Sequence, residues 1–162
     1  MNRPPQPVLD PAFWEQRIGE YPGFIRSAMC HCTDEVWNYH KDRHTAALAA
    51  VIRPTDSLLD AGCGYGRLLD MLPQDWHGAY LGVDLSPGFI KVAAQTYPTR
   101  EFRVADLRYA IAGISKKFDW AVGIGLQRML LVNCGPEVWA QVESTLKAVS
   151  TNQLFLNFDG FE

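Results

Sequence analysis

The segment 57–67 combines one acidic residue with three glycines at alternate positions, in the order Asp60, Gly62, Gly64 and Gly66. The apolar residues before Asp60 are typical of a buried strand, and the glycines let the backbone turn tightly and approach a ligand closely. An amphipathic run follows, so backbone N–H groups at the start of a helix over 65–72 would face the same ligand. The pattern therefore predicts a binding site for a flat or polar small molecule.

Two further acidic residues follow apolar runs that are typical of strands. Asp84 ends the run 79–84, and Asp106 ends the run 102–106. The carboxyl ends of parallel strands meet at one edge of a sheet, where ligands bind, and an acidic side chain there accepts hydrogen bonds from ribose hydroxyls. We therefore expect Asp84 and Asp106 to lie beside the glycine turn. The alternative is that each carboxylate only caps the helix or turn after it.

These elements together resemble the class I S-adenosylmethionine-dependent methyltransferases. The D-x-G-x-G-x-G turn, the strand ends Val-Asp-Leu-Ser and Ala-Asp-Leu, and a fourth strand over 118–124 that begins with Phe-Asp follow the order of that family. The resemblance covers roughly residues 55–160. It implies an α/β fold: a Rossmann-like parallel sheet of about five strands, in the order 3-2-1-4-5, flanked by helices. It also implies S-adenosyl-L-methionine as the cofactor. The family's C-terminal β-hairpin is not expected, because the sequence stops soon after its fifth predicted strand.

The resemblance assigns roles to individual residues at this edge of the sheet. Asp84 would hold the ribose hydroxyls, Leu85 would pack on the adenine, and Asp106 would accept a hydrogen bond from the adenine amine. Gly125 would line the side of the sulfonium group. The implied set for the cofactor consists of Asp60, Gly62, Gly64, Asp84, Leu85, Asp106, Leu107 and Gly125.

A dense group of polar and aromatic residues occupies the segment 37–44. His40 and His44 are four positions apart and would share one face of a helix. Histidine is suited to removing a proton from a methyl acceptor near neutral pH, so these two are the predicted catalytic residues. Arg43 is predicted to bind the carboxylate of the cofactor. The alternative is an ordinary surface helix with a mixed polar face.

A metal site is the other chemistry that this region suggests. Cys30, His31 and Cys32 precede the same two histidines, and two thiolates with two imidazoles bind zinc. The C-x-C spacing is tight, however, and no second cysteine pair accompanies it. We therefore predict no metal.

The segment that follows the fourth strand bears on the acceptor. It reads Gly-Leu-Gln-Arg-Met-Leu-Leu and contains neither the Pro-Pro motif nor the Pro-Cys motif of the family's DNA-base methyltransferases. The net charge of −3 and the pI near 5.8 also do not favour a nucleic-acid partner. We therefore expect a small-molecule acceptor.

The remaining sequence predicts the elements that position these groups. Residues 1–54 would form a tail and a helical lid, with helices opened by Asp10-Pro11 and by Thr33. Residues 55–162 would form the cofactor-binding core, in one compact domain overall. Its other predicted elements are helices opened by Ser86-Pro87 and near Pro136 and strands over 57–62 and 153–158. No apolar run is long enough to span a bilayer, no signal peptide is evident, and four cysteines do not suggest disulfides, so a cytoplasmic location is expected.

The predicted function is methyl transfer from S-adenosylmethionine to a small molecule by in-line displacement, in which positioning and desolvation supply most of the catalysis. Two alternatives stay open: a non-catalytic cofactor-binding subunit or sensor, and an enzyme that breaks down the cofactor. The last strand would lie at an open, uncharged sheet edge. It could pair with a second copy or a different partner, or the N-terminal segment could fold across it.

Overall fold

The computed structural model describes residues 7–23, 25–29 and 32–158, in which helices precede and then alternate with strands. The elements in chain order are α1 (Pro11–Glu20), α2 (Ile25–Met29), α3 (Asp34–Val51), β1 (Leu58–Ala61), the 3₁₀-helix η1 (Arg67–Met71), β2 (Tyr80–Asp84), α4 (Pro87–Thr96), β3 (Glu101–Val104), β4 (Phe118–Ile124), α5 (Leu126–Cys134), α6 (Pro136–Val149) and β5 (Ser150–Leu156). None of the helices in these ranges is long and apolar enough to cross a membrane.

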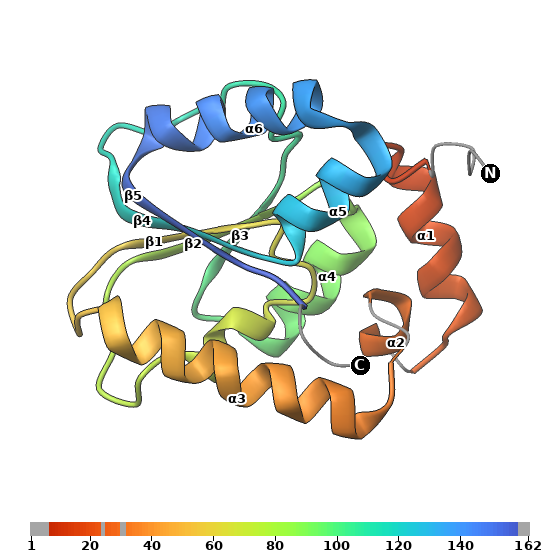
Figure 1. Ribbon diagram of the computed structural model, residues 1–162, viewed down its shortest axis with the longest axis horizontal. Coiled ribbons are helices and arrows are strands. Elements are labelled where there is room, and N and C mark those ends of the chain that lie inside the picture. The colour runs from red at the N-terminus through yellow and green to blue at the C-terminus, as the bar shows by residue number, and fades with distance from the viewer. Residues whose placement is uncertain (1–6, 24, 30–31, 159–162) are drawn as a thin grey trace.

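All strands are parallel and form one sheet in the order β3-β2-β1-β4-β5, which confirms the predicted α/β topology. The pair Asp60 and Gly82 gives the register between the central strand β1 and its neighbour β2. Helices α5 and α6 cover one face of the sheet, and α3 and α4 lie on the other (Figure 1). Helices α1 and α2 lie beyond the carboxyl ends of the strands, which is where a cover for the predicted site has to be.

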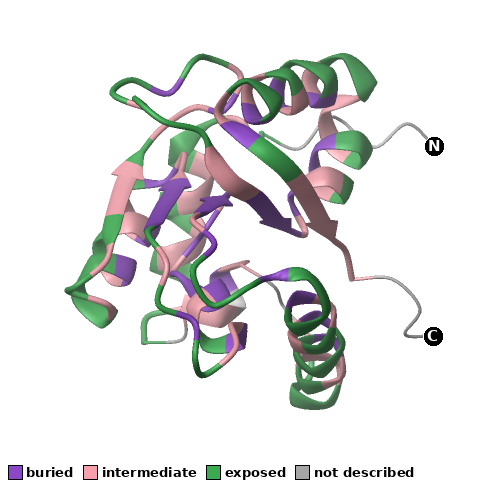
Figure 2. Ribbon diagram, turned by 90° about the vertical axis from the view of Figure 1, so that its left-hand side faces the viewer, coloured by how far each residue is buried: buried purple, intermediate pink, exposed green. Residues whose placement is uncertain are grey.

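The central strand is buried on both faces because its side chains alternate between two apolar layers. Leu58 packs in the layer beneath α3 and η1, and its neighbour Leu59 packs in the layer beneath α5 and α6. Both side chains are fully buried. The central strands are thus mostly buried, whereas the outer faces of the helices are exposed (Figure 2). This sandwich holds the carboxyl ends of the strands in fixed positions.

The helix starts predicted from the sequence are confirmed by their caps. Asp10 accepts a hydrogen bond from the backbone N–H of Ala12, and the Thr33 hydroxyl accepts one from Val36. The Ser86 hydroxyl accepts one from Phe89 at 3.1 Å and caps α4. Each cap satisfies a backbone donor that a helix cannot pair internally.

One expectation about helices is wrong. The predicted helix over 65–72 is only the short η1, because Leu72 precedes Pro73, whose ring disfavours the helical conformation of the residue before it. Leu72 is accordingly extended, with φ −71° and ψ 151°. Helix α5 begins directly after Gly125, which serves as its N-cap.

The C-terminal strand is displaced from its prediction. β5 covers Ser150–Leu156 rather than 153–158, and it lies at the edge of the sheet as expected. Pairing of this edge with another chain stays a prediction, as do the boundary between residues 54 and 55 and the cytoplasmic location.

Candidate functional site

The glycine turn follows β1 and has the backbone conformation that its composition requires. Gly62, Gly64 and Gly66 have φ values of +68°, +53° and +89°, in the left-handed region that other residues adopt at a cost. A Cβ atom on Gly64 would come within 1.6 Å of the Met29 methyl carbon, and one on Gly62 within 3.2 Å of a Leu126 methyl carbon. A side chain at either position would therefore require its neighbour to move, in addition to the cost of the left-handed backbone.

Asp84, at the end of β2, binds this turn directly. One carboxylate oxygen accepts a hydrogen bond from the Gly64 N–H at 2.8 Å, and the other accepts one from the Ser86 N–H at 2.9 Å. Burial raises the pKa of the carboxyl, and the backbone donors oppose that rise. A carboxylate has about four lone-pair positions, so Asp84 can accept further hydrogen bonds from a ligand.

Asp106, after β3, is held by an ion pair. Its carboxylate accepts from the Arg108 guanidinium, with the Nε atom 3.0 and 3.1 Å from the two oxygens, and from the Arg108 backbone N–H at 3.0 Å. The Arg108 guanidinium lowers the pKa of Asp106, which therefore stays ionised at neutral pH. The sequence alternative, a carboxylate that caps the following turn, describes part of this arrangement.

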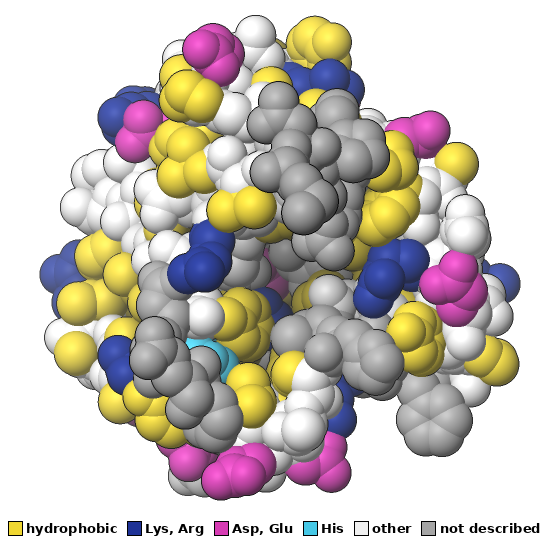
Figure 3. Space-filling model, turned by 45° about the vertical axis from the view of Figure 1, so that its right-hand side comes forward, with side chains coloured by type: hydrophobic (Ala, Val, Ile, Leu, Met, Phe, Trp, Pro, Cys, Tyr) yellow, Lys and Arg dark blue, Asp and Glu magenta, His cyan; other side chains and the backbone are white. Residues whose placement is uncertain are grey.

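These groups line a cavity of about 390 Å³ at the carboxyl edge of the sheet. The volume falls in the range of small-molecule sites, as does the mostly apolar lining with a few polar groups. Six residues that the sequence predicted line it, namely Gly62, Asp84, Leu85, Asp106, Leu107 and Gly125. In Figure 3, hydrophobic side chains and several Lys or Arg side chains surround a hollow on this side of the molecule.

Helices α1 and α2 contribute residues to the cavity, and a lid role for the N-terminal segment stays a prediction. Phe13, Trp14 and Arg17 of α1 and Met29 of α2 line the cavity. The Arg17 Nε atom donates to the carbonyl oxygen of Ala28 at 2.7 Å, which joins α1 to α2. The available sequence signal for these residues was the aromatic pair Phe13 and Trp14 in α1.

Three predicted cofactor residues, Asp60, Gly64 and Arg43, do not line the cavity. Asp60 is buried and accepts a hydrogen bond from the Tyr80 hydroxyl at 2.7 Å, so its carboxylate is directed into the core and does not line the cavity. Burial raises its pKa to about 7. Arg43 is exposed and also lies outside the lining, with its guanidinium 2.6 Å from the Tyr39 hydroxyl.

The two predicted catalytic histidines share a helix face, but that face is buried. His40 and His44 are 2% and 5% exposed and pack against the Phe158 ring, at centroid distances of 4.9 and 5.4 Å. The His44 Nε2 atom lies 3.1 Å from the carbonyl oxygen of Asn157, and burial lowers its pKa. Phe158 lines the cavity and the histidines do not, so the ring stands between them and the site. The alternative of an exposed polar face is wrong for these two residues.

Arg67 is a cavity residue that the sequence reasoning missed. It is 7% exposed, its guanidinium lies 4.8 Å from the Phe158 ring centroid and 5.1 Å from that of Trp37, and its Nη2 atom donates to the Ile124 carbonyl oxygen. A buried arginine needs such partners. Its position directly after the glycine turn was the available signal.

Within the ranges given above, no three His, Cys, Asp or Glu side chains gather as a metal site. Cys30 and His31, the residues that suggested zinc, lie outside those ranges.

A family model described as a methyltransferase domain matches residues 58–148 of the chain. A protein of Mycobacterium tuberculosis that is assigned as a methyltransferase is 36% identical over 91 residues, which are 56% of this chain and 53% of that protein. Two further curated relatives are matched over 26% of their lengths. The chain thus spans about half the length of the first relative and about a quarter of the others.

Two solved structures share the fold. A TehB-like SAM-dependent methyltransferase of Corynebacterium glutamicum is 26% identical with a TM-score of 0.54, over 88% of this chain and 72% of that one. A sugar N-methyltransferase of a Streptoalloteichus species is 20% identical with a TM-score of 0.55, over 68% of this chain and 43% of that one.

Proposed function

The chain belongs to the class I S-adenosylmethionine-dependent methyltransferases, whose cofactor is S-adenosylmethionine, and we propose that it methylates a small molecule. The observation that carries this proposal is the cavity at the carboxyl edge of the sheet, which brings the glycine turn, Asp84 and Asp106 to one place. When bound, the cofactor supplies an electrophilic methyl group on a sulfonium sulfur.

The residues of the cavity fit this cofactor. Asp84 keeps acceptor capacity for ribose hydroxyls, because the Gly64 and Ser86 N–H groups each bind a different oxygen of a carboxylate that has about four lone-pair positions. Leu85 and Leu107 offer apolar contacts for the adenine, and Asp106 lies beside them, where a hydrogen bond from the adenine amine would have to replace part of its ion pair with Arg108. The bare backbone of the glycine turn leaves room for the rest of the molecule.

The acceptor is proposed to bind beside α5. The main cavity continues into a shallow hollow of about 260 Å³, and the two share Gly125, Met129, Asn133 and Phe158. Arg128 lines only the shallow part. This side suits a small acceptor with an apolar body, and a fold that is shared with a sugar methyltransferase is compatible with that size.

The chain contributes to the transfer chiefly by orienting the two reactants and excluding water. The apolar walls made by Phe13, Trp14 and Met129 supply the exclusion. The roles of His40 and His44 as bases stay predictions. A proton on either imidazole would have to pass the Phe158 ring to reach the cavity.

The proposal is tested by calorimetry with S-adenosylhomocysteine, followed by incubation with methyl-labelled cofactor and fractions of a metabolite extract. We expect binding in the micromolar range or tighter and label in a product of low molecular mass. Binding without any labelled product would favour the non-catalytic subunit, and no binding of either form of the cofactor would refute the proposal.

A further inference from the structure

α1 forms one wall of the cavity, and a single carboxylate fastens it to the opposite wall. The Glu15 Oε1 atom accepts a hydrogen bond from the Ser86 hydroxyl at 2.7 Å and another from the Gly88 N–H at 2.9 Å. Glu15 lies on α1 between the cavity residues Trp14 and Arg17, whereas its two donors open α4. The contact therefore spans from the cover of the site to the strand end that holds Asp84.

The same contact completes the cap of α4. Ser86 uses its hydroxyl oxygen to accept from Phe89 and its hydroxyl proton to donate to Glu15. The Gly88 N–H is one of the donors that a helix leaves unpaired at its start, and a carboxylate there also interacts favourably with the helix dipole. Glu15, which lies on another helix, thus supplies the hydrogen-bond acceptor that the Gly88 N–H does not find within α4.

Through Ser86 this cap reaches the proposed ribose site. The Ser86 N–H donates to Asp84 at 2.9 Å, and the Ser86 side chain, which is fully buried, is the one that Glu15 binds. Glu15, Ser86 and Asp84 therefore form one chain of hydrogen bonds. A shift of α1 changes the position of the Ser86 turn and, with it, of the Asp84 carboxylate.

The packing around Gly88 shows how close the two helices are. A Cβ atom on Gly88 would lie 2.6 Å from the Glu15 Oε2 atom and 2.8 Å from the Ile18 Cδ1 atom. The Trp14 ring also packs against Phe89 of α4, at a centroid distance of 5.9 Å. The approach that the hydrogen bonds need is thus possible only because residue 88 lacks a side chain.

We propose that Glu15 is a positioning residue that fastens α1 over the bound cofactor and fixes the Asp84 turn, so that it controls the release of the cofactor product. This inference rests on the proposed function. Because residues of α1 line the cavity that would hold the bound cofactor, the strength of the Glu15 contact is expected to affect the dissociation rate more than the association rate.

The test measures the affinity and the dissociation rate of S-adenosylhomocysteine for the wild type and for Glu15→Ala, Glu15→Gln and Gly88→Ala. Loss of a helix cap typically amounts to about 1 kcal/mol, so Glu15→Ala is expected to raise the dissociation constant and the dissociation rate each by about fivefold. Glu15→Gln keeps the acceptor oxygen and should recover part of this loss. Gly88→Ala displaces the flexible end of Glu15 and should match Glu15→Ala, and the double variant should be no worse than either.

The matched controls are on the same helix. Glu20 accepts a hydrogen bond from Gln16 of the same helix. A Cβ atom on Gly19 would have no neighbour within 4 Å. Glu20→Ala and Gly19→Ala should therefore keep the dissociation rate of the wild type within about twofold, a change of about 0.4 kcal/mol. A Glu15→Ala rate within that same range would overturn the inference.

Amide hydrogen exchange of the protein without ligand separates this inference from the proposed function. Glu15→Ala and Gly88→Ala should speed exchange in α1 and at the start of α4 while exchange in β1 and β4 stays unchanged. Unchanged α1 exchange would refute the contact even if the cofactor binds. Failure of the wild type to bind S-adenosylhomocysteine, with faster α1 exchange in both variants, would instead refute the proposed function.

Discussion

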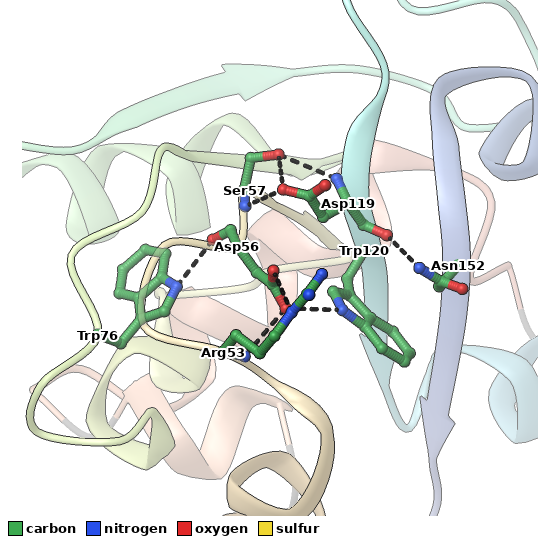
Figure 4. A network of polar contacts seen from close by, with 7 residues as sticks. All are labelled: Arg53, Asp56, Ser57, Trp76, Asp119, Trp120 and Asn152. Carbon is green, nitrogen blue, oxygen red and sulfur yellow. Dashed lines mark hydrogen bonds and ion pairs between the residues drawn. The ribbon is translucent and has the colours of Figure 1, made fainter.

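Aspartate side chains occur at both ends of the parallel sheet, but their surroundings differ. At the carboxyl end, Asp84 and Asp106 line a cavity. At the amino end, Asp56 and Asp119 belong to a closed polar network that joins β1, β4 and β5 (Figure 4). A carboxylate at a strand end is therefore not a sign of function in itself. What differs is where its hydrogen-bond partners come from.

The network at the amino end uses side chains from distant parts of the chain. Asp56 accepts from the Trp120 indole N–H at 3.1 Å and from the Arg53 backbone N–H at 2.9 Å. Its own backbone carbonyl accepts from the Trp76 indole at 2.9 Å. Ser57 binds Asp119 through both its N–H and its hydroxyl. These partners close the amino end against a ligand and tie the strands together.

The carboxyl end is held by fewer and mostly local partners. Asp84 is bound by backbone N–H groups of the two adjoining turns, and Asp106 by Arg108, two residues on. Such contacts orient the carboxylates but leave part of each facing the cavity. The comparison shows that a carboxylate can bind a ligand only through the lone pairs that donors of the protein itself leave unused. It predicts that substitutions at one end alter binding and that substitutions at the other alter stability.

The largest effect is expected for Asp84→Ala. Two charge-assisted hydrogen bonds to the ribose, at about 1.5 kcal/mol each, would be lost, so the dissociation constant of S-adenosylhomocysteine should rise about a hundredfold. Calorimetry measures this change, and Asp119→Ala is the matched control at the other end. Equal affinities in the wild type and in Asp84→Ala would remove the distinction between the two ends.

The next effect concerns stability. Asp56 is 3% exposed, and Asp56→Ala leaves the Trp120 indole N–H without its acceptor, so the free energy of unfolding should fall by about 2 kcal/mol. Urea unfolding measures the loss, and cofactor affinity at a temperature where the variant is folded should stay within about twofold of the wild type. A variant that unfolds normally but binds tenfold more weakly would show that the two ends are coupled.

The carboxyl end was the easier one to predict from the sequence, because its key residues belong to the turns that follow consecutive strands. The glycine turn and Asp84 are 20 positions apart and belong to consecutive strands, so a pattern along the chain reveals them. The pairing of Ser57 with Asp119 spans 62 positions and follows from no such pattern.

Some residues near the site were predicted wrongly or missed because their surroundings also depend on contacts between residues far apart in sequence. Helical spacing correctly placed His40 and His44 on one face, but it does not say whether that face meets solvent, the cavity or the core. Phe158 decides this, and it lies more than a hundred positions away. Arg67 contacts Phe158 and the Ile124 carbonyl oxygen, and both of these partners are also remote from it in sequence.

A smaller effect is expected in how the free energy of unfolding depends on pH, which differs between the two ends of the sheet. Asp60 lies at the carboxyl end of β1, and burial raises its pKa to about 7, above the ordinary value near 3.8. A raised pKa in the folded state contributes stability that is complete below the unfolded value and is lost as the pH rises through about 7. The free energy of unfolding should therefore fall by at least about 1.4 kcal/mol between pH 5 and pH 8 through this group.

Asp60→Asn tests this expectation, since an amide keeps an acceptor for the Tyr80 hydroxyl but does not titrate. Urea unfolding at pH 5 and pH 8 should show a smaller difference for the variant than for the wild type. The same pH dependence in both proteins would mean that Asp60 is ionised throughout this range, and that buried Arg67 compensates its charge more fully than the contacts above suggest.

The smallest effect is expected at the amino end and has the opposite sign. The Ser57 N–H and hydroxyl lower the pKa of Asp119, so the stability that Asp119 contributes is present above the unfolded value of about 3.9 and is lost as the pH falls through the folded value. Asp119→Asn should lower the free energy of unfolding at pH 7 by about 1 kcal/mol and change it little at pH 2. Acid titration of the unfolding midpoint measures the difference between the two proteins. Because Asp60 and Asp119 shift in opposite directions, the pH of greatest stability should move down when Asp119 is replaced and up when Asp60 is replaced, and a shift of both variants in one direction would contradict the contrast between the ends of the sheet.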